Sequence, residues 1–341
     1  MYKDFFMEIA RLYPYPGGEE KALQIVREYF DGLGERLEEP LLSYPAYFLP
    51  GRGEAASAVV AYLDEPGFLL REYLGNGFVG ISCYGAVDKR ALTAQEVFLL
   101  GKERHFGMIG NKPSHYLTDD DRKATVDVEK LFVDTGLTTE ELEESHPIGS
   151  FIGLKAEPRM LRGQTVAGHG LSCKVGCAAL LIALKALSEA KDRGACYFLI
   201  VDRSARGQYE LRRALEKYRV KTVLSLAGVP SNSRIDDPEQ CRLGGGAVLL
   251  YDSCVDFTLT KKLRKSGEEA GLPLQSRFYN FDADSMLETV FTAGTGRSCA
   301  GIGIPVENSG MPFELSCLDD LETAGMLAAS LLYKEIAYDP I

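Results

Sequence analysis

Apolar side chains recur at helical spacing near the start of the chain, within residues 19–34. Acidic residues open this segment and a glycine follows its last apolar position, as at many helix ends. We therefore expect an amphipathic helix. The apolar face consists of Leu23, Val26, Phe30 and Leu33.

The run SAVVAYL at 57–63 is rich in β-branched residues and follows a glycine-containing turn, which predicts a buried strand. It leads directly into the polar tetrapeptide Asp64, Glu65, Pro66 and Gly67. From Phe68 the pattern changes to short apolar runs separated by Gly, Asn and Asp turns, with one capped helix starting near Thr138. This pattern predicts a small, mostly β module.

Beyond Leu171, strand-like and helix-like segments alternate, which is typical of a helix-covered, largely parallel sheet. We expect helices at 174–190, 206–217, 256–270 and 318–335, and strands at 195–201, 221–227, 246–251, 274–279 and 300–304. The predicted fold class is α/β with a mixed, largely parallel sheet. Because the first helix and strand resemble this layer, the predicted domains are 1–66 plus 164–341, with a mostly β, barrel-like insertion at 67–163.

Charge and composition narrow the classes of partner. The 341 residues carry a formal net charge of −11, which disfavours extended contact with nucleic-acid phosphates or anionic lipid. No basic run precedes an apolar core at the N-terminus, and no stretch approaches the roughly 20 apolar residues of a membrane span. The eight cysteines are scattered without the spacing of a disulfide framework. We expect a cytoplasmic protein with no nucleic-acid or membrane partner.

Collinear segments along nearly the whole chain resemble the tetrahedral aminopeptidases, dinuclear-zinc exopeptidases that include the deblocking and glutamyl aminopeptidases. The resemblance implies the fold of that family and an inserted β domain that mediates assembly into a homo-oligomer. The segments that carry it are AYLDEPGFLL, GMIGNKPSHYL, LFVDTGLTTEELEESHPIGSFI, GHGLSCKVGCAALLIAL, LGGGAVLLYD, LPLQSRFYNFDADS and IGIPVENSGMPFE.

The same resemblance implies two zinc or cobalt ions, held by imidazole and carboxylate, with a glutamate as general base. Here most of those positions hold other residue types, so we predict no metal cofactor. The first histidine position is Tyr62, and the bridging-carboxylate pair falls on Ser172 and Cys173. The Glu-Glu pair falls near Val201 and Asp202, the strand-end aspartate near Ala227 or Gly228, and the final histidine on Gly310.

Several polar residues nevertheless persist in the segments that would line the old cleft. We expect Asp64 and Glu65 to be structural, since no ligand histidine is left for the aspartate to orient. Asp202, Asp282, Asp284, Glu307 and Asn308 are further candidates for lining a binding cleft. Such groups are consistent with ligand binding without hydrolysis and equally with a solvated rim.

Cys173 is a candidate nucleophile, because a helix N-terminus and the adjacent Lys174 would both lower the pKa of its thiol. A buried cysteine that acts as a small apolar residue is the commoner case.

Four hypotheses follow. The leading one is a non-catalytic or repurposed member of the fold that binds a peptide or amino acid. The second is a peptidase with a carboxylate metal site built from Asp64, Asp202, Asp284 and Glu307. The third is a thiol hydrolase that uses Cys173. The fourth is a structural subunit that assembles with a competent relative.

Overall fold

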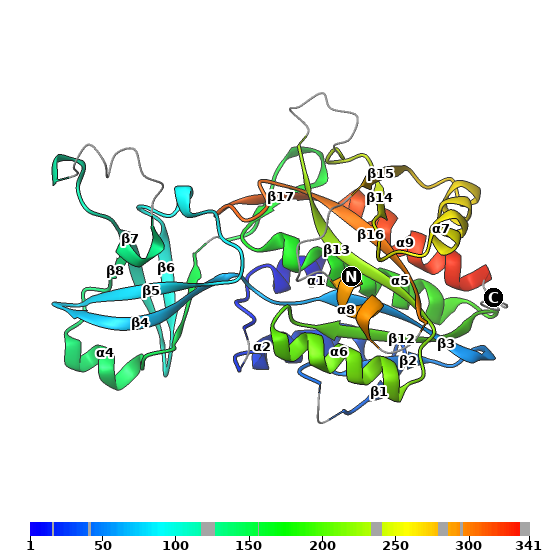
Figure 1. The fold of residues 1–341 in the computed structure, drawn as a ribbon, viewed down its shortest axis with the longest axis horizontal. Helices are drawn as coiled ribbons and strands as arrows, with labels where there is room; N and C mark the ends of the chain where they lie inside the picture. Colours follow the sequence, from blue (N-terminus) through cyan, green and yellow to red (C-terminus); the bar gives the residue numbers. More distant parts are fainter. Residues whose placement is uncertain are drawn as a thin grey trace.

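The computed structural model describes residues 1–15, 17–39, 42–116, 127–155, 157–232, 241–278, 286–293 and 296–334. A closed β-barrel lies beside a larger α/β domain, and strands β3 and β4 follow each other directly across the junction (Figure 1). The α-helices are α1 (Tyr2–Ile9), α2 (Glu20–Phe30), α4 (Thr139–Ser145), α5 (Val175–Glu189), α6 (Ala205–Lys217), α7 (Phe257–Glu269), α8 (Met286–Thr292) and α9 (Leu318–Lys334).

The α/β domain is built on a mixed sheet, to which the described residues contribute 11 strands. Its central strands β12, β3, β13 and β16 run parallel, and antiparallel strands flank them. The strands are β1 (Glu35–Leu37), β2 (Ala46–Leu49), β3 (Arg52–Tyr62), β10 (Arg159–Met160), β11 (Thr165–Gly168), β12 (Gly194–Val201), β13 (Thr222–Ser231), β14 (Ala247–Tyr251), β15 (Leu274–Phe278), β16 (Ser298–Glu307) and β17 (Glu314–Cys317).

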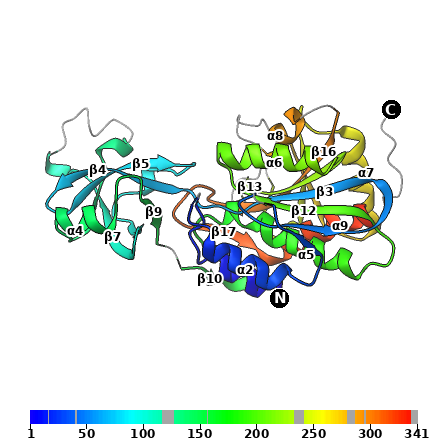
Figure 2. The ribbon, with the colours of Figure 1, turned by 90° about the horizontal axis from the view of Figure 1, so that it is seen from below.

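Helices cover both faces of this sheet, as Figure 2 shows from below. Apolar residues of α1, α2, α5, α7 and α9 form one core with one face. Residues of α6 and α8 form a second core with the other face. This double cover explains why Val59 and Val60, which point to opposite faces of β3, are both fully buried.

Helix α5 is the central helix of the larger core. Within the described residues, Leu171–Glu189 is long and apolar enough to cross a membrane by length and composition, but 83% of that window is buried inside the fold. Its glycine Gly176 allows close approach to β13, because a Cβ there would lie 2.2 Å from the carbonyl oxygen of Leu226. The apolar run is thus accounted for by packing against the sheet and α9.

The barrel closes in the order β4, β5, β8, β7, β6 and β9 around its own apolar core. Helix α4 packs beside it, and Thr138 and Glu141 form the capping box expected from the sequence. The barrel strands are β4 (Gly67–Gly75), β5 (Phe78–Tyr84), β6 (Glu96–Leu100), β7 (Arg104–Gly110), β8 (Phe132–Asp134) and β9 (Phe151–Leu154).

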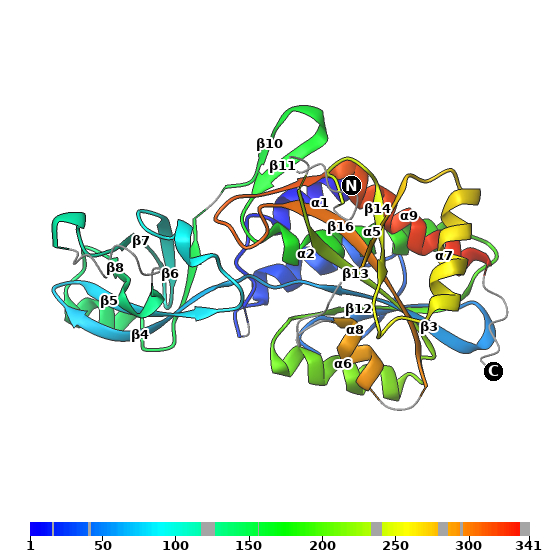
Figure 3. The same ribbon diagram turned by 45° about the horizontal axis from the view of Figure 1, so that its top comes forward.

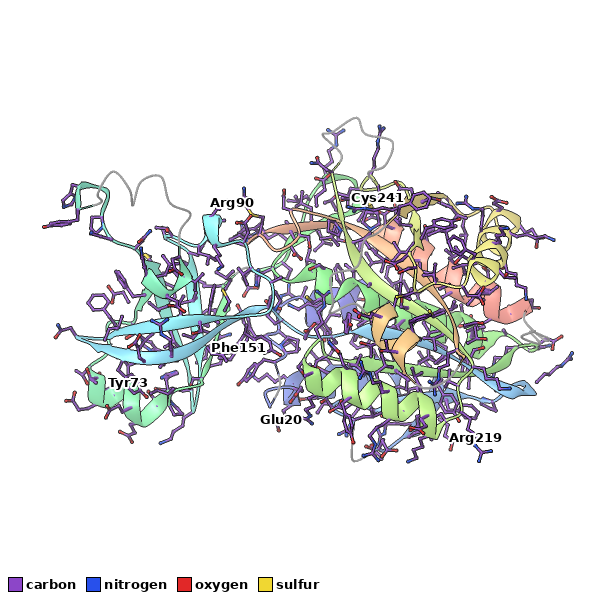
Figure 4. All side chains as sticks on the ribbon, in the orientation of Figure 1. Glu20, Tyr73, Arg90, Phe151, Arg219 and Cys241 are labelled. Carbon is purple, nitrogen blue, oxygen red and sulfur yellow. The ribbon has the colours of Figure 1, made fainter. Side chains whose placement is uncertain are left out.

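Aromatic side chains of the N-terminal segment pack across the junction between the barrel and the α/β domain. The rings of Tyr15 and Phe151 stack with centroids 4.6 Å apart, and Figure 4 marks Phe151 at this junction. The ring of Tyr13 lies against Gly153, where a Cβ would meet it at 2.4 Å. After the barrel, β10 and β11 form a hairpin in the large sheet, which projects from the α/β domain in Figure 3.

The predicted fold class is confirmed, and the predicted elements lie within a few residues of those observed. Sequence reasoning missed α1 and α8, which are only 8 and 7 residues long. In α1 the aromatic pair Phe5 and Phe6, together with Ile9, is fully buried by contacts with distant elements. Such short helices are stabilised by tertiary packing more than by local sequence.

Candidate functional site

A pocket of ≈ 460 Å³ opens where the parallel strands β3 and β12 end, at the edge of the sheet that faces the barrel. This is the usual position of ligand sites in open α/β sheets. Its wall combines the loop after β3, the η5 turn (Leu171–Cys173) before α5, the start of α6, the end of β5 and the loop after β16. The lining residues are Asp64, Glu65, Pro66, Tyr84, Gly85, Ala86, Ser172, Cys173, Arg203, Ser204, Ala205, Gln208, Ser309 and Gly310.

Arg203 lies at the centre of the polar wall. Its Nη2 donates to the carbonyl oxygen of Ser172 at 3.1 Å, and its guanidinium lies over the ring of Tyr62, 5.0 Å from the centroid. Its backbone N–H donates to Oδ2 of Asp64 at 3.1 Å. The cation is therefore fixed in place while 37% of its side chain stays exposed.

A second cation, which is fully buried, lies behind the pocket. Lys174 is fully buried, pairs with Glu65 and donates to the carbonyl oxygen of Leu12 at 3.0 Å. Nε2 of His169 lies 3.3 Å from Oε1 of Glu65. Burial raises the pKa of Glu65 to about 7, against the opposing effect of Lys174, and burial lowers the pKa of His169.

Glu314 joins the two loops on the far side of the pocket. Its carboxylate accepts from the backbone N–H and hydroxyl of Ser172 at 2.7 and 3.0 Å, and from the backbone N–H of Gly310 at 2.7 Å. The barrel is tied to the same loop, because the N–H of Asp88 donates to the carbonyl oxygen of Gly310 at 2.8 Å. Hydrogen bonds thus connect the pocket's rim across both domains.

Of the residues expected from the sequence, Asp64, Glu65, Ser172, Cys173 and Gly310 come together in the pocket wall. Burial raises the pKa of the Cys173 thiol, with Arg203 opposing the effect. This direction is opposite to the one expected from a helix N-terminus and the adjacent Lys174, because the thiol is buried and Lys174 pairs with Glu65. The thiol therefore lacks the lowered pKa that a nucleophilic cysteine needs.

The other expected residues lie outside the pocket wall. Val201 and Tyr62 belong to the apolar core below it, and Asp202 is buried with its Oδ1 accepting from the N–H of Ser204. Ala227 pairs with Gly303 inside the sheet. Glu307 ends β16 and Asn308 forms the following turn with φ of 56°. Asp282 and Asp284 lie outside the described residues.

Sequence reasoning missed the roles of Arg203, Lys174 and Glu314. Lys174 stands at the arginine position of the resembling Leu-Asp-Asp-Arg-x-Gly segment, and Glu314 ends the resembling segment IGIPVENSGMPFE. Arg203 follows directly after the Glu-Glu position. The sequence shows each of these three charged residues close to an altered ligand position. It does not show which residues they contact, because those contacts are made with distant parts of the chain.

Residues 47–327 match the family described as M42 glutamyl aminopeptidase. The chain belongs to the M42 family.

Similar proteins agree with this assignment. The M42 chain is 24% identical to the putative aminopeptidase SgcX of Escherichia coli (strain K12), covering 83% of this chain and 80% of that protein. It is 23% identical to a putative aminopeptidase of Acetivibrio thermocellus, covering 90% and 91%.

Two solved structures confirm the fold. A TET aminopeptidase from a marine sediment archaeon, Thaumarchaeota archaeon, matches with a TM-score of 0.89 at 20% identity, covering 98% of this chain and 97% of that one. The TET1 peptidase of Pyrococcus horikoshii matches with a TM-score of 0.83 at 20% identity, covering 98% and 100%.

The two metal ions implied by the M42 fold do not fit the residues of this pocket. Among the described residues, no group of three or more His, Cys, Asp or Glu side chains is arranged to hold a metal ion. Gly310, at the final histidine position, has φ of 81°, which favours glycine and would strain a histidine. The guanidinium of Arg203 already lies beside Asp64, with Nε 3.8 Å from Oδ1, so a positive charge of the protein stands next to this carboxylate.

The buried carboxyl group of Glu65 should make stability depend on pH. Because its pKa is higher in the folded chain than its ordinary 4.5, the folded state binds more protons between about pH 4.5 and about pH 7. The free energy of unfolding should therefore fall as pH rises through this interval, by roughly 3 kcal/mol at most. Urea denaturation at several pH values measures it.

The variant Glu65→Gln should flatten this part of the pH profile, since it removes the titrating group. Glu144→Gln, on the exposed face of α4, is the matched control and should leave the profile unchanged. Burial also raises the pKa of Asp320, to about 6. Because Asp320 titrates in both proteins, the difference between the pH profiles of Glu65→Gln and the parent protein reports the contribution of Glu65. An identical slope in Glu65→Gln and the parent protein would refute the assignment to Glu65.

Proposed function

We propose that this M42 member has lost dinuclear-metal peptidase activity and binds an amino acid or peptide in the pocket without hydrolysing it. One observation carries the proposal. The guanidinium of Arg203 contacts the ring of Tyr62 and the carbonyl of Ser172, two positions where the family resemblance implies metal ligands. The guanidinium group thus lies beside the positions where the family resemblance implies metal ligands.

The charge balance of the pocket supports binding without metal. Zinc sites draw about three protein ligands per ion, from imidazole, thiolate or carboxylate. Here Glu65 is compensated by Lys174, and Glu314 by hydrogen bonds from Ser172 and Gly310. A dication would have to displace two fixed cations and break these hydrogen bonds.

We also propose that the chain assembles into a homo-oligomer through its barrel and is located in the cytoplasm. The TET1 peptidase of Pyrococcus horikoshii can assemble into a tetrahedron or a large octahedral shell, which supports the first part of this proposal. The scattered cysteines support the second, because eight cysteines without framework spacing suit a reducing compartment.

Protein purified without chelator should contain far less than one zinc, cobalt or manganese ion per chain. It should also release no N-terminal residues from peptides after incubation with these ions. Elemental analysis and a peptide-hydrolysis assay measure the two quantities, with a metal-containing M42 aminopeptidase treated identically as the positive control. Near-stoichiometric metal together with peptide hydrolysis would overturn the proposal in favour of an unconventional metallopeptidase.

A further inference from the structure

The charged pair in the pocket wall is incompletely hydrogen-bonded. Asp64 is 4% exposed, and its Oδ1 has no hydrogen-bond partner among the described residues. Nε of Arg203 likewise has none, and the two atoms lie 3.8 Å apart, too far for a hydrogen bond. A buried acceptor and a buried donor left in this state both destabilise the empty pocket.

We propose that the pocket binds the head group of a free α-amino acid, with the ammonium on Asp64 and the carboxylate on Arg203. The inference rests on the function proposed above and names the ligand class. An α-amino acid carries a donor cation and an acceptor anion on one carbon atom. Asp64 and Arg203 present the complementary acceptor and donor side by side.

Arg203 is suited to a carboxylate because a guanidinium offers five N–H donors in a planar fork. In the described part of the chain its side chain donates one hydrogen bond, from Nη2 to Ser172. The ring of Tyr62 and the carbonyl of Ser172 hold it in one orientation, so little side-chain freedom is lost on binding. The N-terminus of α6, which begins at Ala205, adds a favourable field for an anion.

Among the residues that line the pocket, Asp64 and Arg203 are the charged groups available to hold a ligand. Glu65 is taken by Lys174, and the remaining wall is neutral, with Tyr84, Cys173 and Gln208 as its larger side chains. The volume of ≈ 460 Å³ exceeds what an amino-acid head group fills, so the pocket also has room for the ligand's side chain.

This arrangement distinguishes a free amino acid from a peptide. The N-terminal residue of a peptide has an ammonium group but no adjacent carboxylate, and the C-terminal residue has the reverse. Either would leave one member of the Asp64 and Arg203 pair without its partner in a buried site. Discrimination of this kind is strong where buried polar groups are left unpaired.

Calorimetric titration of the full-length protein with a panel of free amino acids tests the inference. The same amino acids as carboxamides, as N-acetyl derivatives and at the N-terminus of dipeptides complete the panel. At least one free amino acid should bind, and its three derivatives should bind about tenfold more weakly or worse.

Two variants locate the site. Arg203→Met should abolish binding, and Ala205→Trp should block the pocket while leaving both ion pairs intact, so the test stands even if Arg203→Met fails to fold. Arg213→Met is the matched control, because it removes an exposed arginine from the same helix outside the pocket, and it should bind normally.

The outcomes separate the two proposals. Equal affinity for free amino acids and their amides, or unchanged binding in Ala205→Trp, would overturn the zwitterion site while leaving non-hydrolytic binding in place. Failure of every amino acid and peptide to bind would overturn both. If the protein binds metal and hydrolyses peptides while free amino acids still bind through Arg203, the proposed function is overturned and the zwitterion site stands.

Discussion

Replacing Lys174 with methionine should lower the free energy of unfolding by about 3–5 kcal/mol at about pH 8, because it strips a fully buried carboxylate of its cation. Methionine keeps the length of the side chain, so the loss is electrostatic and not a cavity effect. The change also removes the hydrogen bond to the carbonyl of Leu12, which ties the N-terminal segment to the pocket. Urea denaturation followed by circular dichroism measures the difference.

The same variant should lose less stability at about pH 5. Without Lys174 the pKa of Glu65 rises further, so the carboxyl group is buried in its neutral form at that pH. The double variant Glu65→Gln with Lys174→Met should recover much of the loss. Lys185→Met, an exposed position on the same helix, is the control and should change stability by less than about 0.5 kcal/mol. A Lys174→Met protein as stable as the control would contradict the buried pair.

Gly176→Ala should destabilise the protein by about 3 kcal/mol or prevent folding, since the added Cβ would lie 2.2 Å from the carbonyl oxygen of Leu226. The obstacle is backbone, so α5 or β13 must move. Either movement displaces Ser172, which lines the pocket. Thermal or urea denaturation measures the loss.

Gly168→Ala is a suitable control, because the closest atom to its Cβ would be the far end of the Leu171 side chain, at 3.0 Å, and Pro158 would lie at an ordinary contact distance of 3.5 Å. That side chain can adjust, and the effect should stay near 1 kcal/mol or below. Equal stability of the Gly176→Ala and Gly168→Ala proteins would show that α5 does not approach β13 as closely as described.

Much of the fold could be predicted from the sequence because its elements follow local rules. The alternation of apolar runs and helical patterns after Leu171 gave the α/β layer, and the short runs between turns gave the barrel strands. Thr138 and Glu141 gave the capped helix through a local hydrogen-bond motif. The short helix α1 could not be found this way, because Phe5 and Phe6 are buried by elements far along the chain.

The altered ligand positions could also be read from the sequence, since residue type alone excludes a histidine at Tyr62 or Gly310. The side chains that come together at these positions could not be predicted in the same way. Arg203 lies 139 positions from Asp64. Only the parallel pairing of β3 with β12 brings the two together, with Val201 opposite Tyr62. The direction of the pKa shift at Cys173 could not be predicted either, because the sequence does not show that the thiol is buried or that Lys174 pairs with Glu65.

Strand β3 passes directly into β4, and Tyr84, Gly85 and Ala86 at the end of β5 supply part of the pocket rim. This arrangement has an evolutionary consequence. The barrel forms the roof of the ligand chamber as well as a separate folding unit. Recombination that exchanged barrels between relatives would exchange this roof at the same time. Under the proposals made above, the assembly surface and the ligand preference would be inherited together in this architecture.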